Sequence, residues 1–298
     1  MKKLSHSQWL LKRLLVTGAL YLCTTGLAWA TVTCSAVASL TPASYAATAA
    51  TTMTGSVAVT CTRSSLLEPT NLSGNGYTAG TPASVAYNIG ADGGNVGTTI
   101  ALSGSNQLDY DLMRPPSFST DWSTGNVTAG VVYFGTSSLT SDTNTTNFQM
   151  QIPAGRWTSP AGNYTELVTV SINHGIQTEL TTFMTDVQVS AACTFPLAPG
   201  DVNFGTYNAL ATGAAKTAFT GFQVLCTQGV PVNIAFDSAS GSLLGLTYGL
   251  SLSPVSGVVS SGTAANYSIN GSMPAGQAGT CSTQVCVGSE SRSITLTY

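Results

Sequence analysis

Apolar and polar residues alternate along most of this chain, and the clearest such run lies near its middle. From Thr181 to Val189, the odd-numbered positions include Phe183, Val187 and Val189, whereas most even-numbered positions are polar. Successive side chains of a strand point to opposite faces, so a period of two predicts a β-strand with one buried face. No segment beyond residue 30 sustains an apolar period of 3.6 residues, and the pattern therefore predicts an all-β protein.

Shorter alternating runs lie on both sides of this strand and form two blocks. Clusters of Gly, Asn, Asp, Ser and Pro separate the runs and mark turns. In the first block the predicted strands are Ser56–Cys61, Ser84–Ile89, Thr98–Leu102, Leu108–Leu112, Val131–Phe134, Phe148–Ile152 and Glu166–Ile172. In the second block they are Phe222–Cys226, Pro231–Phe236, Leu246–Leu250 and Ser293–Tyr298.

The second block repeats the plan of the first. Residues 151–155 and 272–276 both contain Pro-Ala-Gly, and an alternating strand follows each of them. Leu246–Leu250 likewise parallels Leu108–Leu112. A repeat of this size predicts tandem domains rather than a short-repeat solenoid. Many short strands separated by turns predict an immunoglobulin-like β-sandwich in each domain.

Residues 1–30 are typical of a secretory signal. Lys2 and Lys3 give a basic start, Leu14–Leu22 is an apolar core too short to span a bilayer, and Ala28-Trp29-Ala30 fits a cleavage site. Removing this segment takes away four of the nine basic residues and none of the twelve acidic ones. The remaining acidic chain has no basic patch, so we do not expect it to bind nucleic acid.

Six of the seven cysteines lie beyond the signal, and an even number in an exported protein favours disulfides. Each repeat opens with a cysteine and has another near the end of its next strong strand, which predicts the pairs Cys34–Cys61 and Cys193–Cys226. The second repeat adds Cys281 and Cys286. Its four cysteines allow three pairings, and the repeat favours Cys193–Cys226 together with Cys281–Cys286.

Five features stand in order in the second repeat: the opening cysteine, Phe204-Gly205-Thr206-Tyr207, the second cysteine, the Pro-Ala-Gly turn and the final alternating strand. In these features the chain resembles the spore coat protein U domain, which is found in subunits of archaic, Csu-type chaperone–usher pili. Gly162-Asn163-Tyr164 also resembles the lead-in to that strand. The second repeat departs from the family in having Ser289-Glu290-Ser291 in place of this lead-in, and the first repeat has no Phe-Gly-x-Tyr.

The resemblance implies a mode of assembly and a set of partners. A pilin domain of this family is a sandwich that lacks its last strand. A periplasmic pilus chaperone fills the groove before the outer-membrane usher is reached, and the donor strand of the next pilus subunit then replaces it. The protein is accordingly expected to pass through the periplasm to the cell surface, as part of a fimbrium. No cofactor is implied.

The ends of the chain predict its place in a pilus. The sequence stops at Tyr298, within its last predicted strand, and only Thr31–Thr33 separate the signal from Cys34. A donor segment needs about ten residues at ~3.3 Å each to span a groove. We therefore expect a subunit that accepts a strand and donates none. The resemblance implies the same, because two-domain tip subunits of such pili carry an adhesive N-terminal domain and a C-terminal pilin domain.

The expected organisation has three parts after the signal. Residues 31–176 form an adhesin-like domain and residues 191–298 form a pilin domain that lacks its last strand. Two interpretations of residues 177–190 remain open. Either they are a plain linker, or they act as a donor strand in cis that closes the first domain with Phe183, Val187 and Val189 inward.

The longest irregular stretch with large apolar residues in the first domain runs from Asp111 to Trp122. Two consecutive prolines argue against a central strand there, so a projecting loop is expected. Met113, Phe118 and Trp122, exposed together, would form an apolar patch of the kind that marks binding sites. The alternative is that Phe118 and Trp122 fold back into the sandwich. Leu66–Pro69 is a second candidate loop.

The sequence offers little for catalysis. His174 stands beside the 177–190 segment and is expected to be exposed to solvent, and no Ser/His/Asp set forms around it. Asp109 and Asp111 share a strand face and are expected to be solvated acids rather than a glycosidase dyad. No Cys/His cluster predicts a metal site. The preferred function is therefore a pilus tip adhesin, followed by a non-adhesive structural or coat subunit, with a secreted carbohydrate-active enzyme third.

Overall fold

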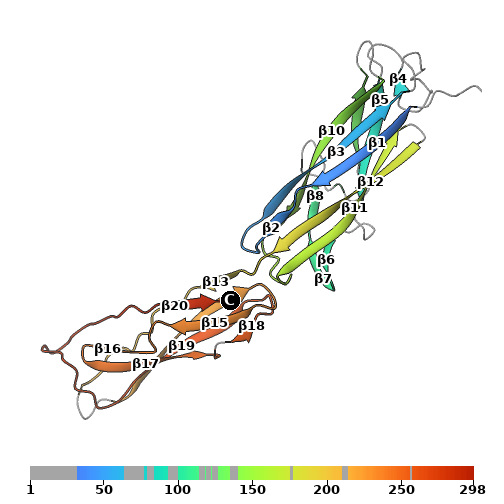
Figure 1. The fold of residues 1–298 in the computed structure, drawn as a ribbon. Coiled ribbons are helices and arrows are strands. Elements are labelled where there is room, and N and C mark those ends of the chain that lie inside the picture. The colour runs from blue at the N-terminus through green and yellow to red at the C-terminus, as the bar shows by residue number, and fades with distance from the viewer. Residues whose placement is uncertain are drawn as a thin grey trace, which may run out of the picture.

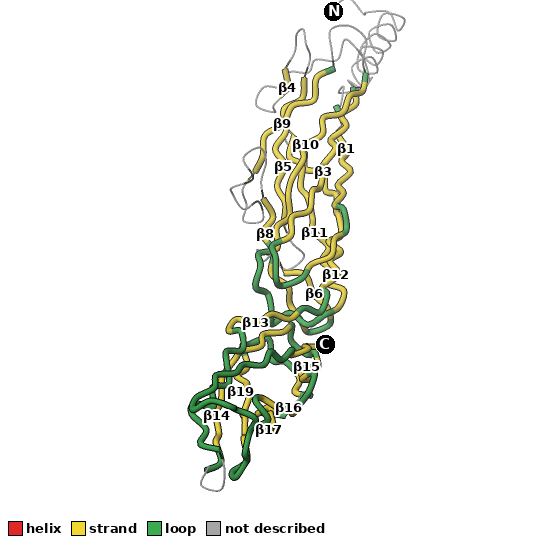
Figure 2. Tube along the Cα trace, turned by 90° about the vertical axis from the view of Figure 1, so that its left-hand side faces the viewer, coloured by secondary structure: helices red, strands yellow, loops and turns green. Residues whose placement is uncertain are grey.

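The computed structural model describes residues 32–63, 77–78, 84–92, 100–113, 118, 122, 127–134, 140–174, 177–209, 214–255 and 257–298. The predicted signal and the candidate loop Leu66–Pro69 lie outside these residues. Within them every regular element is a β-strand, and Figures 1 and 2 show two bodies joined end to end. The prediction of an all-β chain with two tandem immunoglobulin-like sandwiches is confirmed.

The first domain consists of two facing sheets. One sheet has the order β1 (Thr33–Leu40), β3 (Thr51–Thr62), β10 (Ser141–Ile152) and β8 (Asp111–Met113). The other has the order β2 (Ala43–Tyr45), β12 (Gln177–Val189), β11 (Gly162–His174), β5 (Ser84–Asp92) and β4 (Tyr77–Thr78). β9 (Val127–Tyr133) pairs with β5, and the hairpin of β6 (Ile100–Ser103) and β7 (Asn106–Asp109) joins the edge of β11.

The second domain repeats this arrangement with fewer strands. Its larger sheet has the order β13 (Cys193–Leu197), β14 (Lys216–Cys226), β19 (Ala265–Met273), β17 (Leu246–Ser253) and β16 (Ser240–Leu243). Its smaller sheet has the order β18 (Val258–Val259), β15 (Pro231–Phe236) and β20 (Ile294–Thr297). β19 had no counterpart among the strands predicted from the sequence.

The same tyrosine contact fixes the Pro-Ala-Gly turn in both domains. In the first domain the Tyr45 hydroxyl donates to the Pro153 carbonyl oxygen over 2.7 Å and accepts from the Arg156 amide. In the second domain the Tyr207 hydroxyl donates to the Pro274 carbonyl oxygen over 2.8 Å and accepts from the Gln277 amide. The first repeat therefore has a structural counterpart of Tyr207, although it lacks the Phe-Gly-x-Tyr sequence.

Three residues, Ser190 to Ala192, connect β12 to β13, and backbone hydrogen bonds hold them on both sides. The Ser190 amide donates to the Tyr45 carbonyl oxygen of the first domain over 2.9 Å. The Thr227 amide of the second domain donates to the Ala192 carbonyl oxygen over 2.9 Å. A further bond runs directly between the domains, from the Gln228 amide to the Trp157 carbonyl oxygen over 2.8 Å.

The two cores differ in size. The core of the first domain contains twenty-nine buried residues among those described, whereas the corresponding cluster of the second contains seven. The sheet around β3 and the sheet around β14 each supply part of the corresponding core. The opposite layer has eight strands in the first domain and three in the second, and no described strand of the second domain is equivalent to β12.

Candidate strand-addition site

The final strand of the first domain, β11, has a partner along its whole length. β12 runs antiparallel to it from Gly162 opposite Val189 to His174 opposite Gln177. Phe183, Val187 and Val189 point into the sandwich and are at most 4% exposed. The Phe183 ring lies 5.0 Å from that of Phe148 on the opposite sheet. Each such side chain stabilises the fold by roughly 1.5–3 kcal/mol relative to an exposed one.

A buried polar contact lies between these apolar side chains. Thr185, fully buried on β12, accepts a hydrogen bond from the Glu166 amide over 2.8 Å and donates to the Glu166 carbonyl oxygen. The Glu166 carboxylate accepts a hydrogen bond from the Tyr110 hydroxyl. Buried polar groups cost free energy unless they are hydrogen-bonded, so this contact favours one register of β12 against β11.

The final strand of the second domain, β20, has a partner on one side. It pairs with β15 from Asn233 opposite Thr297 to Phe236 opposite Ile294, and its other edge has no strand partner among the described residues. Ile294 and Leu296, the inward residues of β20, remain partly exposed. An unpaired strand edge beside incompletely covered apolar side chains is a template for the addition of another strand.

The two final strands can be aligned through the strands they pair with. β5 and β15 share the sequence Asn-Ile-x-x-Asp, which starts at Asn88 in one and at Asn233 in the other. Ile172 of β11 lies opposite Ile89, and Leu296 of β20 lies opposite Ile234. Leu296 therefore corresponds to Ile172, and β20 corresponds to the second half of β11.

This alignment places Glu290 and Arg292 at the positions of Glu166 and Val168. The Tyr248 hydroxyl donates to Glu290 Oε2 over 2.7 Å, as Tyr110 does to Glu166. Arg292 Nη2 lies 2.6 Å from Glu290 Oε1, and Arg292 Nε donates to the Tyr248 hydroxyl over 2.8 Å. Desolvation raises the pKa of Tyr248, with smaller effects from the two charged neighbours. The hydrogen bond to Tyr248 raises the pKa of Arg292, which is cationic in any case.

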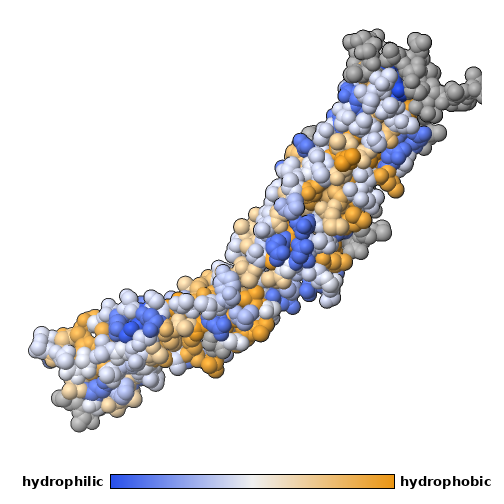
Figure 3. All heavy atoms as spheres, viewed as in Figure 1, coloured by the Kyte–Doolittle hydropathy of each residue, from blue (hydrophilic) through white to orange (hydrophobic). Residues whose placement is uncertain are grey.

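Apolar side chains are exposed on the second domain, as Figure 3 shows. Phe195 and Leu197 at its first strand are 36% and 53% exposed, and Tyr298 is 56% exposed. In the first domain the positions next to the final strand are covered by β12. The first strand and the last residue of the second domain thus leave large apolar side chains uncovered.

The three disulfides join the predicted pairs, Cys34–Cys61, Cys193–Cys226 and Cys281–Cys286. The first two connect directly opposed residues on adjacent strands, β1 and β3 in the first domain and β13 and β14 in the second. The third closes a short loop between β19 and β20, ahead of the unpaired edge. Disulfides of this kind stabilise a domain mainly by restricting its unfolded chain.

The predicted apolar patch at the Asp111–Trp122 stretch does not form, because Trp122 is fully buried. Its Nε1 donates to the Ile89 carbonyl oxygen over 3.2 Å, and its ring lies 5.4 Å from that of Phe148. Met113 and Phe118 are partly buried. Of the two alternatives left open by the sequence, Trp122 follows the second and packs back into the sandwich, since burying a large ring whose N–H is hydrogen-bonded is favourable.

His174 was expected to be exposed to solvent, and this is also wrong, because the structure buries it completely. It occupies the last inward position of β11, in series with Val168, Val170 and Ile172. Desolvation lowers the pKa of His174, and the nearby Glu179 partly opposes that effect. The alternation of β11, carried two residues beyond Ile172, would have revealed this.

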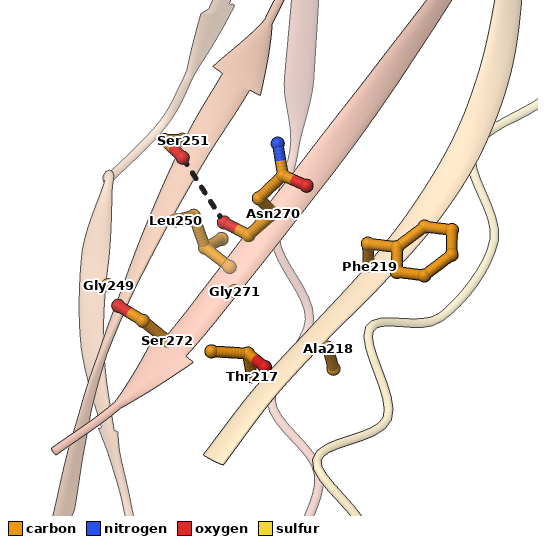
Figure 4. A pocket seen from close by; sticks show the side chains of 9 residues that line it. All are labelled: Thr217, Ala218, Phe219, Gly249, Leu250, Ser251, Asn270, Gly271 and Ser272. Carbon is orange, nitrogen blue, oxygen red and sulfur yellow. Dashed lines mark hydrogen bonds between the residues drawn. The ribbon is translucent and has the colours of Figure 1, made fainter. Parts of the chain in front are cut away.

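Two hollows lie on the described surface. One, of about 570 Å³, lies on β14, β17 and β19 and is lined by uncharged residues, including Phe219, Ser251 and Asn270 (Figure 4). Another, of about 320 Å³, contains Asp109, which lies 3.2 Å from Arg156. Among the described residues no group of three or more His, Cys, Asp or Glu is placed to hold a metal ion. The same residues include no helix long and apolar enough to cross a membrane.

Comparison with known proteins finds one matching family model and several similar solved structures. The model of the Spore Coat Protein U domain family matches residues 22–171. No curated protein sequence matches the chain. Among solved structures, the CsuC–CsuE chaperone–tip adhesion subunit complex of Acinetobacter baumannii matches with 12% identity and a TM-score of 0.44, over 89% of this chain and 100% of the matched one.

A second match is the CupB6 tip adhesin from Pseudomonas aeruginosa, with 10% identity and a TM-score of 0.30 over 77% of this chain and 82% of the other. AggA, the major subunit of aggregative adherence fimbriae from Escherichia coli, matches with 13% identity and a TM-score of 0.25, over 53% and 96% of the two chains.

Proposed function

This chain belongs to the Spore Coat Protein U domain family, and from that premise we propose that it is a pilus subunit assembled by β-strand addition at its second domain. The observation that carries the proposal is the contrast between β11, paired with β12 throughout, and β20, whose outer edge has no partner among the described residues. The first domain thus shows the completed sandwich, and the second shows the open edge to which a strand from another chain could be added.

In this proposal β12 is the donor strand of the first domain, supplied in cis, and residues 177–190 are more than a linker. The strand leads within three residues into β13, so the first domain is joined to the second as one subunit would be joined to the next. A domain filled by its own chain has no groove to offer, and the second domain is then the one acceptor in the described chain. This supports a position at the end of the pilus, with the first domain outermost.

The proposed partners follow from the acceptor groove. A periplasmic chaperone would occupy the edge of β20 during export, and the donor strand of a neighbouring subunit would replace it after delivery to the outer-membrane usher. The proposed localisation is the cell surface, and the proposed role of the first domain is attachment. Burial of Trp122 removes the apolar patch expected there, so a non-adhesive structural subunit remains the second candidate.

Production of residues 191–298 alone in the periplasm tests the acceptor state. We expect this domain to aggregate or be degraded, because its core is open along β20, and to be recovered when a pilus chaperone of this class is co-produced. A soluble monomer that unfolds cooperatively without any chaperone would refute the proposal.

The adhesive role has a separate test. Bacteria that assemble pili with and without this chain are compared for attachment to surfaces, and immunogold labelling locates the chain on the pilus. We expect label at the tip and loss of attachment in its absence. Equal attachment by pili of normal length that lack the chain would favour the structural alternative.

A further inference from the structure

The first half of β11 depends on β12 for its strand pairing. Among the described residues, pairing of β11 with β5 begins at Thr169, on the side away from β12. Ahead of Thr169, residues 162–168 pair with β12. On their other side a single pair is formed, between Thr165 and Leu102 of β6. Without β12, most backbone donors and acceptors of residues 162–168 would have no strand partner.

The corresponding half of the final strand in the second domain is not a strand. By the alignment of Leu296 with Ile172, residues 286–293 correspond to residues 162–169. They form no regular element, and most of them are exposed. Side chains hold this segment in place instead, because Arg292 reaches the Ser240 carbonyl oxygen over 3.1 Å as well as Glu290 and Tyr248.

We propose that strand addition to the second domain folds residues 286–293 into the missing first half of β20, in the register that β12 adopts against β11. This inference rests on the proposed function and states what the incoming strand does to this chain. The site is thus longer than the four residues of β20, and it extends back to Cys286, where the Cys281–Cys286 disulfide anchors the segment.

The register specifies the side chains that the incoming strand presents. Opposite Glu290 it carries a small hydroxyl residue, because Thr185 opposite Glu166 bonds to both the amide and the carbonyl oxygen of that residue. Opposite Arg292 it carries a large apolar side chain, as Phe183 lies opposite Val168. That side chain would pack on the aliphatic stem of Arg292, whose guanidinium already contacts Glu290 and Tyr248.

The experiment supplies the chain with a copy of its own strand. Residues 177–189 are appended to Tyr298 of the full chain through a short Gly/Ser turn, and hydrogen exchange of the amides of residues 286–293 is measured with and without the extension. We expect exchange to slow at least ~tenfold, because local opening would now break a continuous ladder.

Two control extensions test whether the protection depends on the apolar side chains and on the register of the added strand. In the first, the positions copied from Phe183, Val187 and Val189 are changed to Ser, and we expect no protection. In the second, one Gly is inserted after the position copied from Thr185, which turns the later apolar residues to the opposite face. We expect this insertion to abolish the protection of the amides nearest Cys286.

The outcomes are distinct. If the extension protects residues 294–297 while residues 286–293 exchange as fast as before, the inference is overturned and the acceptor site stands. If the Gly insertion protects as well as the copied strand, the proposed register is overturned. If no extension protects any part of the second domain, strand addition itself is wrong, and the proposed function fails with it.

Discussion

Replacement of Val187 by aspartate tests whether β12 belongs to the first domain. Val187 is fully buried between Tyr164 on β11 and Ala43 on β2. Loss of its apolar burial costs roughly 1.5–3 kcal/mol. A carboxylate there would have to be protonated, and at pH 7 this costs about 4 kcal/mol for a group with an ordinary pKa near 3.9. The sum, about 6 kcal/mol, is comparable to the whole stability of a domain.

Tryptophan fluorescence reports on the first domain alone. Of the four tryptophans, Trp9 and Trp29 lie in the predicted signal, and the other two, Trp122 and Trp157, lie in the first domain. In urea, a loss of about 6 kcal/mol lowers the unfolding midpoint by roughly 2–3 M if the slope is about 2–3 kcal/mol per molar. The expected result is therefore a first domain that is largely unfolded before urea is added, or one with a strongly reduced midpoint.

Met184→Asp is the matched control, because Met184 lies on the same strand and is 58% exposed. The same charge on the outer face should change stability by no more than ~0.5 kcal/mol. If Val187→Asp shifts the midpoint no further than Met184→Asp does, residues 177–190 are a plain linker and the donor-strand proposal is wrong. A smaller effect of Val187→Asp near pH 4 than at pH 7 would support the protonation argument.

Three other changes have defined outcomes. Trp122→Ala should lower the stability of the first domain by about 3–5 kcal/mol, measured by circular dichroism in urea. A cost near zero would contradict the burial of this side chain. Trp157→Ala should cost less, since Trp157 is only partly buried. For His174, desolvation lowers the folded pKa, so its contribution is present above the unfolded value near 6.5 and is lost as pH falls through that value. His174→Gln should therefore weaken the loss of stability between pH 7 and pH 5, and an unchanged pH profile would contradict this.

The alternating pattern predicted most of the fold because it records which side of each strand is buried. Phe183, Val187 and Val189 stood at period two in the sequence, and all three are buried. The cysteine spacing and the repeat predicted all three disulfide pairs. β19 was missed because its sequence, Ala265–Met273, alternates apolar residues with Asn, Ser and Gly, which are also the residues of turns.

Side-chain burial in irregular segments was not predictable in the same way. Trp122 follows two prolines in a stretch without periodicity, so its sequence context does not show whether the ring faces the solvent or the core. The burial of Trp122 depends on Ile89 and Phe148, which are distant in the sequence and provide the hydrogen-bond acceptor and the neighbouring ring. His174 was misjudged for a simpler reason, since the alternation of β11 continues to it.

The sequence by itself determined that this protein is built from two related β-sandwiches with one disulfide across the first two strands of each. These properties are local or repeated, and alternation and cysteine spacing carry them. Only the tertiary structure decided which strand edges are occupied. β11 and β20 both alternate apolar and polar residues, yet among the described residues β11 is paired on both sides and β20 on one, because backbone hydrogen bonding depends on whether another segment reaches the edge. That difference, invisible in the alternation of either strand, is the basis of the proposed function.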